Sequence, residues 1–230
     1  MTLNADAQKQ AAARAAADLV EPGMIVGVGT GSTALHFIRA LADRVHAGLD
    51  VTTVATSRDT EKLLRDEQIA IRALDASFTL DLAVDGADAF DPRLDLIKGR
   101  GGALLREKIV AEASERFVVI VDASKRVASL RDGGRLPVEV VSFGWQRTAA
   151  AIERMGYEPT LRVDREGNEF VTDNGNLVLD VRVNDLRDPS EIGARLKALT
   201  GVVEHGLFVG IAQLVLVGRA DGSVERLARR

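Results

Sequence analysis

The 230-residue sequence contains no cysteine, three histidines and few aromatic residues, which make up 4% of the chain. Without cysteine, a disulfide framework, an iron–sulfur cluster, a cysteine zinc site and a cysteine nucleophile are all excluded. The histidines, His36, His46 and His205, are scattered along the sequence, so we expect no histidine cage for a metal ion. Carboxylates, hydroxyls, amines and the backbone are left to perform any chemistry.

Charge and hydropathy argue against two further classes of protein. Lys and Arg number 30 against 34 Asp and Glu, a net charge of −4, and no basic run is interleaved with aromatic residues, so nucleic-acid binding is not expected. No apolar stretch approaches the roughly 18 residues of a membrane span. The first twenty residues lack a basic segment followed by an apolar core, so we expect no signal peptide and a cytoplasmic location.

Apolar segments alternate with helical patterns over the first 130 residues. Helices are expected at 6–20, 34–45, 60–67 and 103–113, and strands at 24–28, 51–55, 69–74, 80–84 and 117–121. Strands that alternate with helices form βαβ units with right-handed crossovers. The predicted fold class is therefore α/β, a mostly parallel Rossmann-like sheet with flanking helices.

The pattern changes near Leu130 and becomes that of a mixed α+β segment. Extended stretches are expected at 137–141, 158–163 and 177–183, and helices at 146–155 and 188–201. A last apolar run, at 212–217, is expected to return to the main sheet. We therefore predict an α/β catalytic domain formed by 1–130 and 207–230, with a smaller α+β domain at 131–206.

A glycine-rich stretch, Gly-Val-Gly-Thr-Gly-Ser-Thr-Ala, lies at 27–34 between an expected strand and an expected helix. Its backbone N–H groups, its hydroxyls and the helix dipole suit an anion. Alternatives are a plain turn or a dinucleotide site, because Gly29, Gly31 and Ala34 fit the loosened fingerprint. However, the next strand ends without the acidic residue that would bind a ribose hydroxyl, and no Walker A lysine follows. A phosphate monoester fits better.

Two carboxylates, Asp85 and Asp88, follow the apolar segment at 80–84 in the order Asp-Gly-Ala-Asp. Ligands bind open α/β sheets at the carboxyl ends of the strands, and neighbouring carboxylates can divide acid and base duties. The alternative is an Asp-rich turn. Lys125 follows the strand expected at 117–121, which places it at the same edge of the sheet as Asp85.

A second glycine-rich stretch, Lys98-Gly-Arg-Gly-Gly102, precedes the helix that carries Glu107. Its cations and N–H groups suit an oxyanion or a phosphate. A carboxylate on a helix that faces a cleft is a candidate general base. The alternatives are a flexible surface loop for the glycines and a solvated surface carboxylate for Glu107.

Taken together, these motifs resemble those of the type A ribose-5-phosphate isomerases. Seven stretches match in family order across nearly the whole chain: 27–34, 84–88, 98–109, 121–125, 136–140, 171–176 and 201–208. The resemblance implies interconversion of ribose 5-phosphate and ribulose 5-phosphate in the non-oxidative pentose phosphate pathway. It also implies an α/β domain with a smaller α+β domain, no required metal or other cofactor, and a homodimer or a dimer of dimers.

The resemblance also implies roles for particular residues. It places the general base on Glu107. To Asp85 we assign ring opening and contacts with the sugar hydroxyls, and to Lys98, with the N–H groups of the loop that follows it, either stabilisation of the enediolate or binding of the substrate. The implied substrate-binding residues are Thr30, Gly31, Ser32, Thr33, Asp85, Gly86, Ala87, Asp88, Lys98, Gly99, Arg100, Gly101 and Lys125. The lysine that holds the phosphate is left open between Lys125, Lys98 and Lys9. The chain departs from the family pattern at Arg100, where glycine is common, and at Ala89, where an acid often stands.

Two other classes of function fit parts of the sequence. A sugar-phosphate-binding regulatory module would keep the phosphate loop, but no DNA-binding element is recognisable. A related sugar-phosphate deaminase or lactonase would need a differently placed acid or histidine. A nicotinamide-dependent oxidoreductase lacks the acid that binds ribose. The isomerase is therefore the preferred hypothesis for the function of this sequence.

Overall fold

The computed structural model describes residues 4–184 and 186–229, which divide into two compact units. The first unit takes in the chain up to Ala87, Arg106–Arg126 and the chain from Gly210 onward. The second takes in Asp88–Leu105 and Val127–Val209. Sequence reasoning assigned 88–105 to the larger domain. In the structure this segment groups with the second unit because its strands β5 (Ala89–Phe90) and β6 (Leu96–Ile97) form a sheet with β12 (Leu207–Phe208).

A seven-stranded sheet forms the centre of the first unit. Its strands, in spatial order, are β14 (Val224–Ala228), β13 (Leu214–Gly218), β7 (Phe117–Asp122), β4 (Leu82–Asp85), β1 (Ile25–Val28), β2 (Thr52–Ala55) and β3 (Ala70–Ile71). Every neighbouring pair is parallel except β13 and β14. The mostly parallel α/β sheet predicted from the sequence is confirmed. Since ligands bind such sheets at the carboxyl ends of the strands, this topology defines where a site can form.

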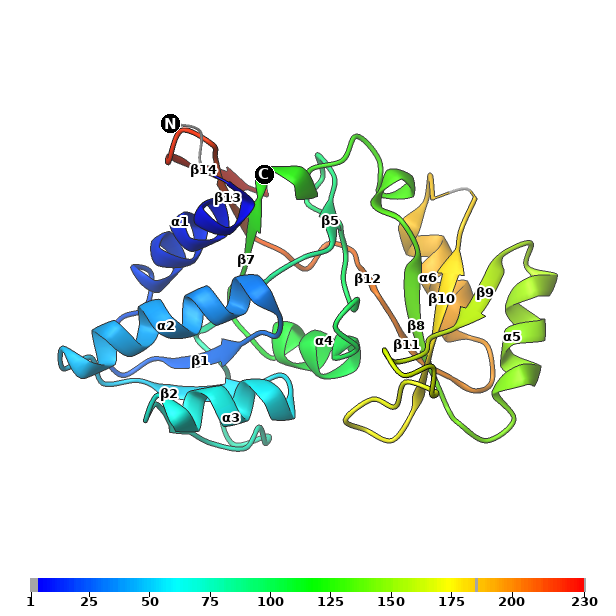
Figure 1. The fold of residues 1–230 in the computed structure, drawn as a ribbon, viewed down its shortest axis with the longest axis horizontal. Coiled ribbons are helices and arrows are strands. Elements are labelled where there is room, and N and C mark those ends of the chain that lie inside the picture. The colour runs from blue at the N-terminus through cyan, green and yellow to red at the C-terminus, as the bar shows by residue number, and fades with distance from the viewer. Residues whose placement is uncertain (1–3, 185, 230) are drawn as a thin grey trace. The chain divides into compact units, whose positions relative to one another are not determined.

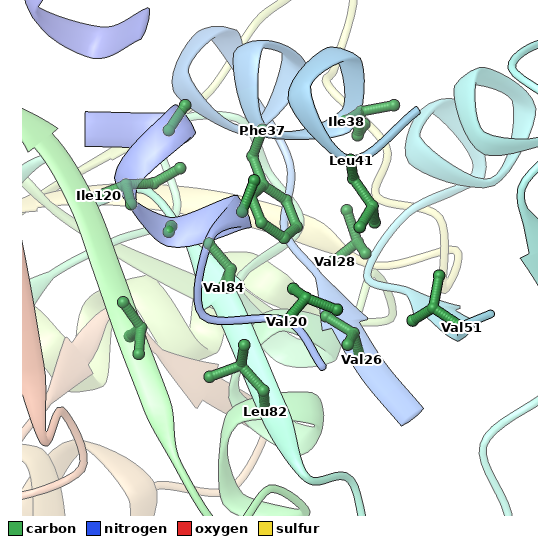
Figure 2. Close-up of a cluster of buried hydrophobic side chains, with 14 of the residues drawn as sticks. Val20, Val26, Val28, Phe37, Ile38, Leu41, Val51, Leu82, Val84 and Ile120 are labelled. Atoms are coloured by element: carbon green, nitrogen blue, oxygen red, sulfur yellow. The ribbon is translucent and has the colours of Figure 1, made fainter. Parts of the chain in front are cut away.

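Helices pack on both faces of this sheet. Three of them are α1 (Ala5–Ala17), α2 (Ser32–His46) and α3 (Arg58–Asp66), labelled in Figure 1. All three contribute buried side chains to a common apolar core. Figure 2 shows Phe37 of α2 lying over valines of β1 and β4 in this core. Gly27 of β1 lies between core residues of that strand, where alternation directs a side chain to the opposite face. A Cβ atom on Gly27 would lie 2.4 Å from Val110 Cγ1, so the glycine allows α4 (Leu104–Glu112) to pack there.

An antiparallel sheet forms most of the second unit, in the order β11 (Val202–His205), β8 (Leu136–Val140), β10 (Leu177–Arg182) and β9 (Glu158–Leu161). The helices α5 (Trp145–Arg154) and α6 (Pro189–Lys197) contribute to its separate apolar core. At the start of α6, the Asp188 side chain accepts a hydrogen bond from Glu191 N at 2.9 Å. This is the N-cap arrangement that satisfies a first-turn N–H group.

The largest differences from the expected elements concern short strands. The strand expected at 69–74 is only the two-residue β3, and sequence reasoning missed β5, β6, β11, β12 and β14. Two-residue strands such as β6 exist because partners far along the chain pair with them, here Leu207 with Ile97. The helix expected to end at Gly201 ends at Lys197. Two short 3-10 helices complete the chain, η1 (Ala123–Lys125) and η2 (Leu130–Gly133).

Candidate active site

The first glycine-rich loop, residues 29–33, connects β1 to α2 and lies directly against Asp85 at the end of β4. The Asp85 carboxylate is buried, with 3% of the residue exposed, and its Oδ1 accepts from Thr30 N at 3.2 Å and from Gly86 N at 2.7 Å. A Cβ atom on Gly29 would lie 2.0 Å from Asp85 Oδ1 and 2.6 Å from Asp85 Cβ. Glycine is therefore required at position 29 for the loop to close over the carboxylate.

Hydroxyl groups from the end of β2 and the start of α3 fix this loop from its other side. Thr30 Oγ1 donates to Ser57 Oγ at 2.8 Å and lies 2.8 Å from Thr56 Oγ1. Thr60 Oγ1 donates to the carbonyl of Gly29 at 2.8 Å. Sequence reasoning treated the end of this strand only as lacking an acid and missed the hydroxyl cluster. The signal was present, since Ser57 is the N-cap of α3 and Thr60 lies three residues later.

The N-terminus of α2 presents donors suited to an anion. Gly31 is its N-cap with a φ of 105°, a conformation that favours glycine. Within the described residues no side chain caps this helix, so the N–H groups of its first turn are available to a ligand. The Nζ atom of Lys9, on α1, donates to Ser32 Oγ at 3.1 Å. The structure thus brings Lys9, one of the three lysines left open by the sequence, to the first glycine-rich loop.

Two more candidate residues of the first unit lie on α4 and η1. Glu107 of α4 is buried with 5% of the residue exposed, which excludes the alternative of a solvated surface carboxylate. Lys125 ends η1 directly after β7, the parallel neighbour of β4, so Lys125 and Asp85 emerge at the same edge of the sheet. Thr33, in the first turn of α2, is also buried. Burying the carboxylate of a residue such as Glu107 costs free energy unless other groups compensate for its lost hydration.

The second glycine-rich loop, residues 98–102, belongs to the second unit. Lys98 is 3% exposed, its N–H donates to Gly206 O at 2.8 Å, and its Nζ lies 5.5 Å from the centre of the Phe208 ring. A Cβ atom on Gly206 would lie 2.1 Å from the Lys98 carbonyl, so this glycine permits the approach of the two segments. Lys98 is therefore held in the interior rather than on a flexible surface loop.

The Asp88 side chain contacts the backbone of this loop at Arg100. Asp88 Oδ2 accepts a hydrogen bond from Arg100 N at 2.9 Å. The guanidinium of Arg100 donates to Gly133 O at 3.2 Å, so its side chain has a partner within the second unit. Gly99, with a φ of 104°, adopts a backbone conformation that favours glycine. Gly101 is exposed, as is Arg100.

Two of the stretches that carry the family resemblance, 136–140 and 171–176, meet at Glu139. This carboxylate is fully buried, and its Oε1 accepts from Thr172 Oγ1 and Asn176 Nδ2, both at 2.9 Å. Hydrogen bonds from neutral donors to a buried charge compensate for its loss of hydration. These hydrogen bonds therefore join the two stretches within the second unit.

No group of three or more His, Asp and Glu side chains among residues 4–184 and 186–229 is arranged to hold a metal ion. Nor does any helix in this part of the chain combine the length and the apolar character needed to cross a membrane. The chemistry that the described residues display is that of buried carboxylates, buried lysine and glycine-rich backbone.

The fold and these loops define an α/β protein whose parallel sheet presents an anion-binding type of loop at the carboxyl end of β1. The family model described as ribose 5-phosphate isomerase A (phosphoriboisomerase A) matches residues 52–222. A second model, the DeoR C terminal sensor domain, matches residues 4–73. The chain belongs to the ribose 5-phosphate isomerase A family.

Individual relatives match over nearly their full length. The ribose-5-phosphate isomerase A of Thermomicrobium roseum is 51% identical over 215 residues, covering 93% of this chain and 91% of the relative. That of Gloeobacter violaceus is 49% identical over 226 residues, covering 98% and 97%.

Solved structures agree with these relatives. A D-ribose-5-phosphate isomerase in complex with phospho-erythronic acid superimposes with a TM-score of 0.95 at 36% identity, covering 99% of this chain and 100% of that one. The ribose 5-phosphate isomerase from Plasmodium falciparum gives 0.94 at 35% identity, covering 98% and 99%.

Proposed function

We propose that this chain interconverts ribose 5-phosphate and ribulose 5-phosphate through an enediolate. The observation that carries the proposal is the match to ribose-5-phosphate isomerases along nearly the whole chain, at 51% identity to one of them. The DeoR sensor-domain model matches only residues 4–73, so a regulatory module is the weaker candidate. Because of the match to isomerases, a related sugar-phosphate deaminase or lactonase is also a weaker candidate than the isomerase.

Glu107 is the proposed base. Its carboxylate removes the proton from C2 of the open-chain aldose, and the electron pair forms the C1–C2 double bond as negative charge moves to O1. The same carboxylate returns the proton to C1, and the hydroxyl proton of O2 moves to O1, which leaves the ketone at C2. A positioned general base contributes a factor of roughly 10²–10⁴ to the rate. The burial of Glu107 supports this role, because it limits proton exchange with water.

Asp85 and Lys98 are proposed to assist two other steps, the opening of the sugar ring and the formation of the enediolate. Asp85 transfers the proton of the anomeric hydroxyl to the ring oxygen, which opens the sugar ring. Lys98 and the N–H groups of the second glycine-rich loop stabilise the negative charge of the enediolate, the type of electrostatic stabilisation an oxyanion hole provides. Asp88 contacts the substrate hydroxyls and, through its bond to Arg100 N, holds the loop.

The phosphate is proposed to lie at the first glycine-rich loop, bound by the first-turn N–H groups of α2, by Ser32 and Thr33, and by Lys9. The contact from Lys9 Nζ to Ser32 Oγ favours Lys9 as the phosphate lysine. Lys125 then contacts the sugar from the carboxyl end of β7. A homodimer or dimer of dimers and a cytoplasmic location stay predictions.

The substitution Glu107→Gln tests this proposal, with Glu112→Gln on the exposed part of the same helix as the matched control. We expect Glu107→Gln to lower kcat by at least about 10²-fold, since the amide cannot accept the C2 proton. Substrate affinity should stay within about tenfold, because the substitution preserves shape. Turnover near that of the wild type would remove Glu107 as the base.

A further inference from the structure

Arg162 lies just after β9, and its guanidinium forms a two-pronged ion pair with Asp180 on the neighbouring strand β10. Arg162 Nε donates to Asp180 Oδ2 at 2.9 Å, and Nη2 donates to Asp180 Oδ1 at 2.5 Å. The two side chains are 12% and 25% exposed, so the pair is largely withdrawn from water. Charge-assisted bonds of this kind fix orientation as well as position.

The remaining terminal nitrogen of Arg162 reaches the second glycine-rich loop. Its Nη1 donates to the carbonyl oxygens of Gly99 and Arg100, both at 3.0 Å. The planar fork of a guanidinium can hold a carboxylate on one edge and two carbonyls from another nitrogen, whereas a lysine ammonium has three donors and no such geometry. Arg162 therefore links β10 to two consecutive peptide groups of the loop.

The peptide group between Gly99 and Arg100 is held at both ends. Its carbonyl accepts from Arg162, and its N–H donates to Asp88 Oδ2. Because the C=O and N–H of a trans peptide point in opposite directions, these two bonds fix the plane of the peptide. The C=O of Arg100 is held by the same guanidinium, which directs the Gly101 N–H away from Arg162.

Phe170 packs against both Arg162 and the second glycine-rich loop. Its ring centre lies 5.6 Å from Arg162 Cζ, within the range of a cation–π contact. A Cβ atom on Gly102 would lie 2.4 Å from this ring, so the loop packs directly on it. The loop that follows Lys98 is thus fixed by a guanidinium at its centre and by a ring at its end.

We propose that Arg162 and Asp180 are positioning residues for the isomerisation: they set the peptide orientations of residues 99–101 and thereby the placement of the donors that stabilise the enediolate. This inference rests on the proposed function of the loop. Arg162 acts through the loop backbone and does not itself contact the substrate. Removing the pair therefore lowers kcat while phosphate binding, which belongs to the first glycine-rich loop, is retained.

The test compares Arg162→Lys and Asp180→Asn with Arg182→Lys. Arg182 is the matched control because it also pairs across β9 and β10, with Glu158 at 3.6 Å, but both side chains are more than half exposed. We expect Arg162→Lys to lower kcat by about 10–100-fold, the scale of a misplacement near 1 Å. KM for ribose 5-phosphate and the inhibition constant of inorganic phosphate should change by less than about threefold. Arg182→Lys should match the wild type.

A double variant shows whether the two residues act as one unit. Arg162→Lys with Asp180→Asn should lower kcat no further than Arg162→Lys alone, because coupled residues lose the same interaction once. A kcat for Arg162→Lys within about twofold of the wild type, or a loss that only follows a reduced folded fraction by circular dichroism, would overturn the proposal. If Arg162→Lys does not fold, Asp180→Asn carries the same comparison.

Hydrogen exchange separates this inference from the proposed function. Exchange at residues 98–102, followed by mass spectrometry, should be faster in Arg162→Lys than in the wild type and unchanged in Arg182→Lys. Equal exchange in all three proteins would overturn the positioning role whatever the activity. A wild-type protein that does not turn over ribose 5-phosphate would instead refute the proposed function, and the exchange result would still report on the loop.

Discussion

The two glycine-rich loops differ in what holds them. The first loop, residues 29–33, is fixed by short side chains at neighbouring strand ends of its own sheet, with Asp85 on one side and the hydroxyls around Thr30 on the other. The second loop, residues 98–102, is fixed by long side chains from about sixty residues further along the chain, Arg162 and Phe170. Two loops of similar composition are thus held by different kinds of side chain. Short carboxylate and hydroxyl groups hold the first, whereas a long guanidinium and an aromatic ring, together with Asp88, hold the second.

This difference has a consequence for how each loop tolerates change. Short partners at van der Waals distance leave no space, so the first loop is sensitive to any added atom at Gly29. A guanidinium that bridges carbonyls leaves the side chain at position 100 without steric constraint from that bridge, so the second loop accepts Arg100 where the family commonly has glycine. The contrast is therefore between position 29, where space excludes a side chain, and position 100, where the loop is held through its backbone.

The largest expected effect comes from adding one carbon to the first loop. Gly29→Ala places a Cβ where the Asp85 carboxylate lies, so either the loop or Asp85 must move. We expect kcat/KM for ribose 5-phosphate to fall by about 10²-fold or more. Steady-state kinetics on folded protein measures this, and a kcat/KM within about threefold of the wild type would show that space does not limit the first loop.

A smaller effect is expected from removing the lysine that contacts the first loop. Lys9→Met keeps the length of the side chain and removes the charge, so a phosphate would lose a charge-assisted bond. We expect KM to rise about tenfold with kcat nearly unchanged. Lys62→Met, on the exposed side of α3, is the control. An unchanged KM for Lys9→Met, with a raised KM for Lys125→Met, would move the phosphate role to Lys125.

The smallest effect is expected in the second loop at Arg100. Arg100→Gly keeps the N–H that Asp88 holds and the carbonyl that Arg162 holds, and loses only the side-chain bond to Gly133 O. We expect kcat/KM to change by less than about threefold and the free energy of unfolding to fall by about 1 kcal/mol. Urea denaturation and steady-state kinetics measure the two quantities. A collapse in substrate affinity would identify the guanidinium as a ligand.

The first loop could be predicted from the sequence because its signal is local. A strand, a glycine-rich turn and a helix follow one another along the chain, and Asp85 follows the strand that turned out to be the neighbour of β1. The parallel sheet was predicted for the same reason, since alternating strands and helices leave a periodic pattern. Lys9 could only be offered as one of three lysines, because the contact to Ser32 depends on how α1 packs beside α2.

The partners of the second loop could not be predicted in the same way. Arg162 stands in a region of ordinary charged and apolar residues, and nothing local marks it as a residue that binds the carbonyls of Gly99 and Arg100. The two-residue strands β5 and β6 were missed because pairing with β12, and not their own sequence, makes them strands. Contacts between segments far apart in the chain decide both features.

The roles proposed for both loops depend on one activity, the isomerisation of ribose 5-phosphate by this chain. The most direct test is a coupled assay that follows ribulose 5-phosphate formation by the wild-type protein, with glucosamine 6-phosphate as the control substrate. We predict turnover of ribose 5-phosphate that is proportional to protein concentration and no conversion of glucosamine 6-phosphate. No turnover of ribose 5-phosphate by folded wild-type protein would contradict this activity, and conversion of glucosamine 6-phosphate in its place would favour the deaminase.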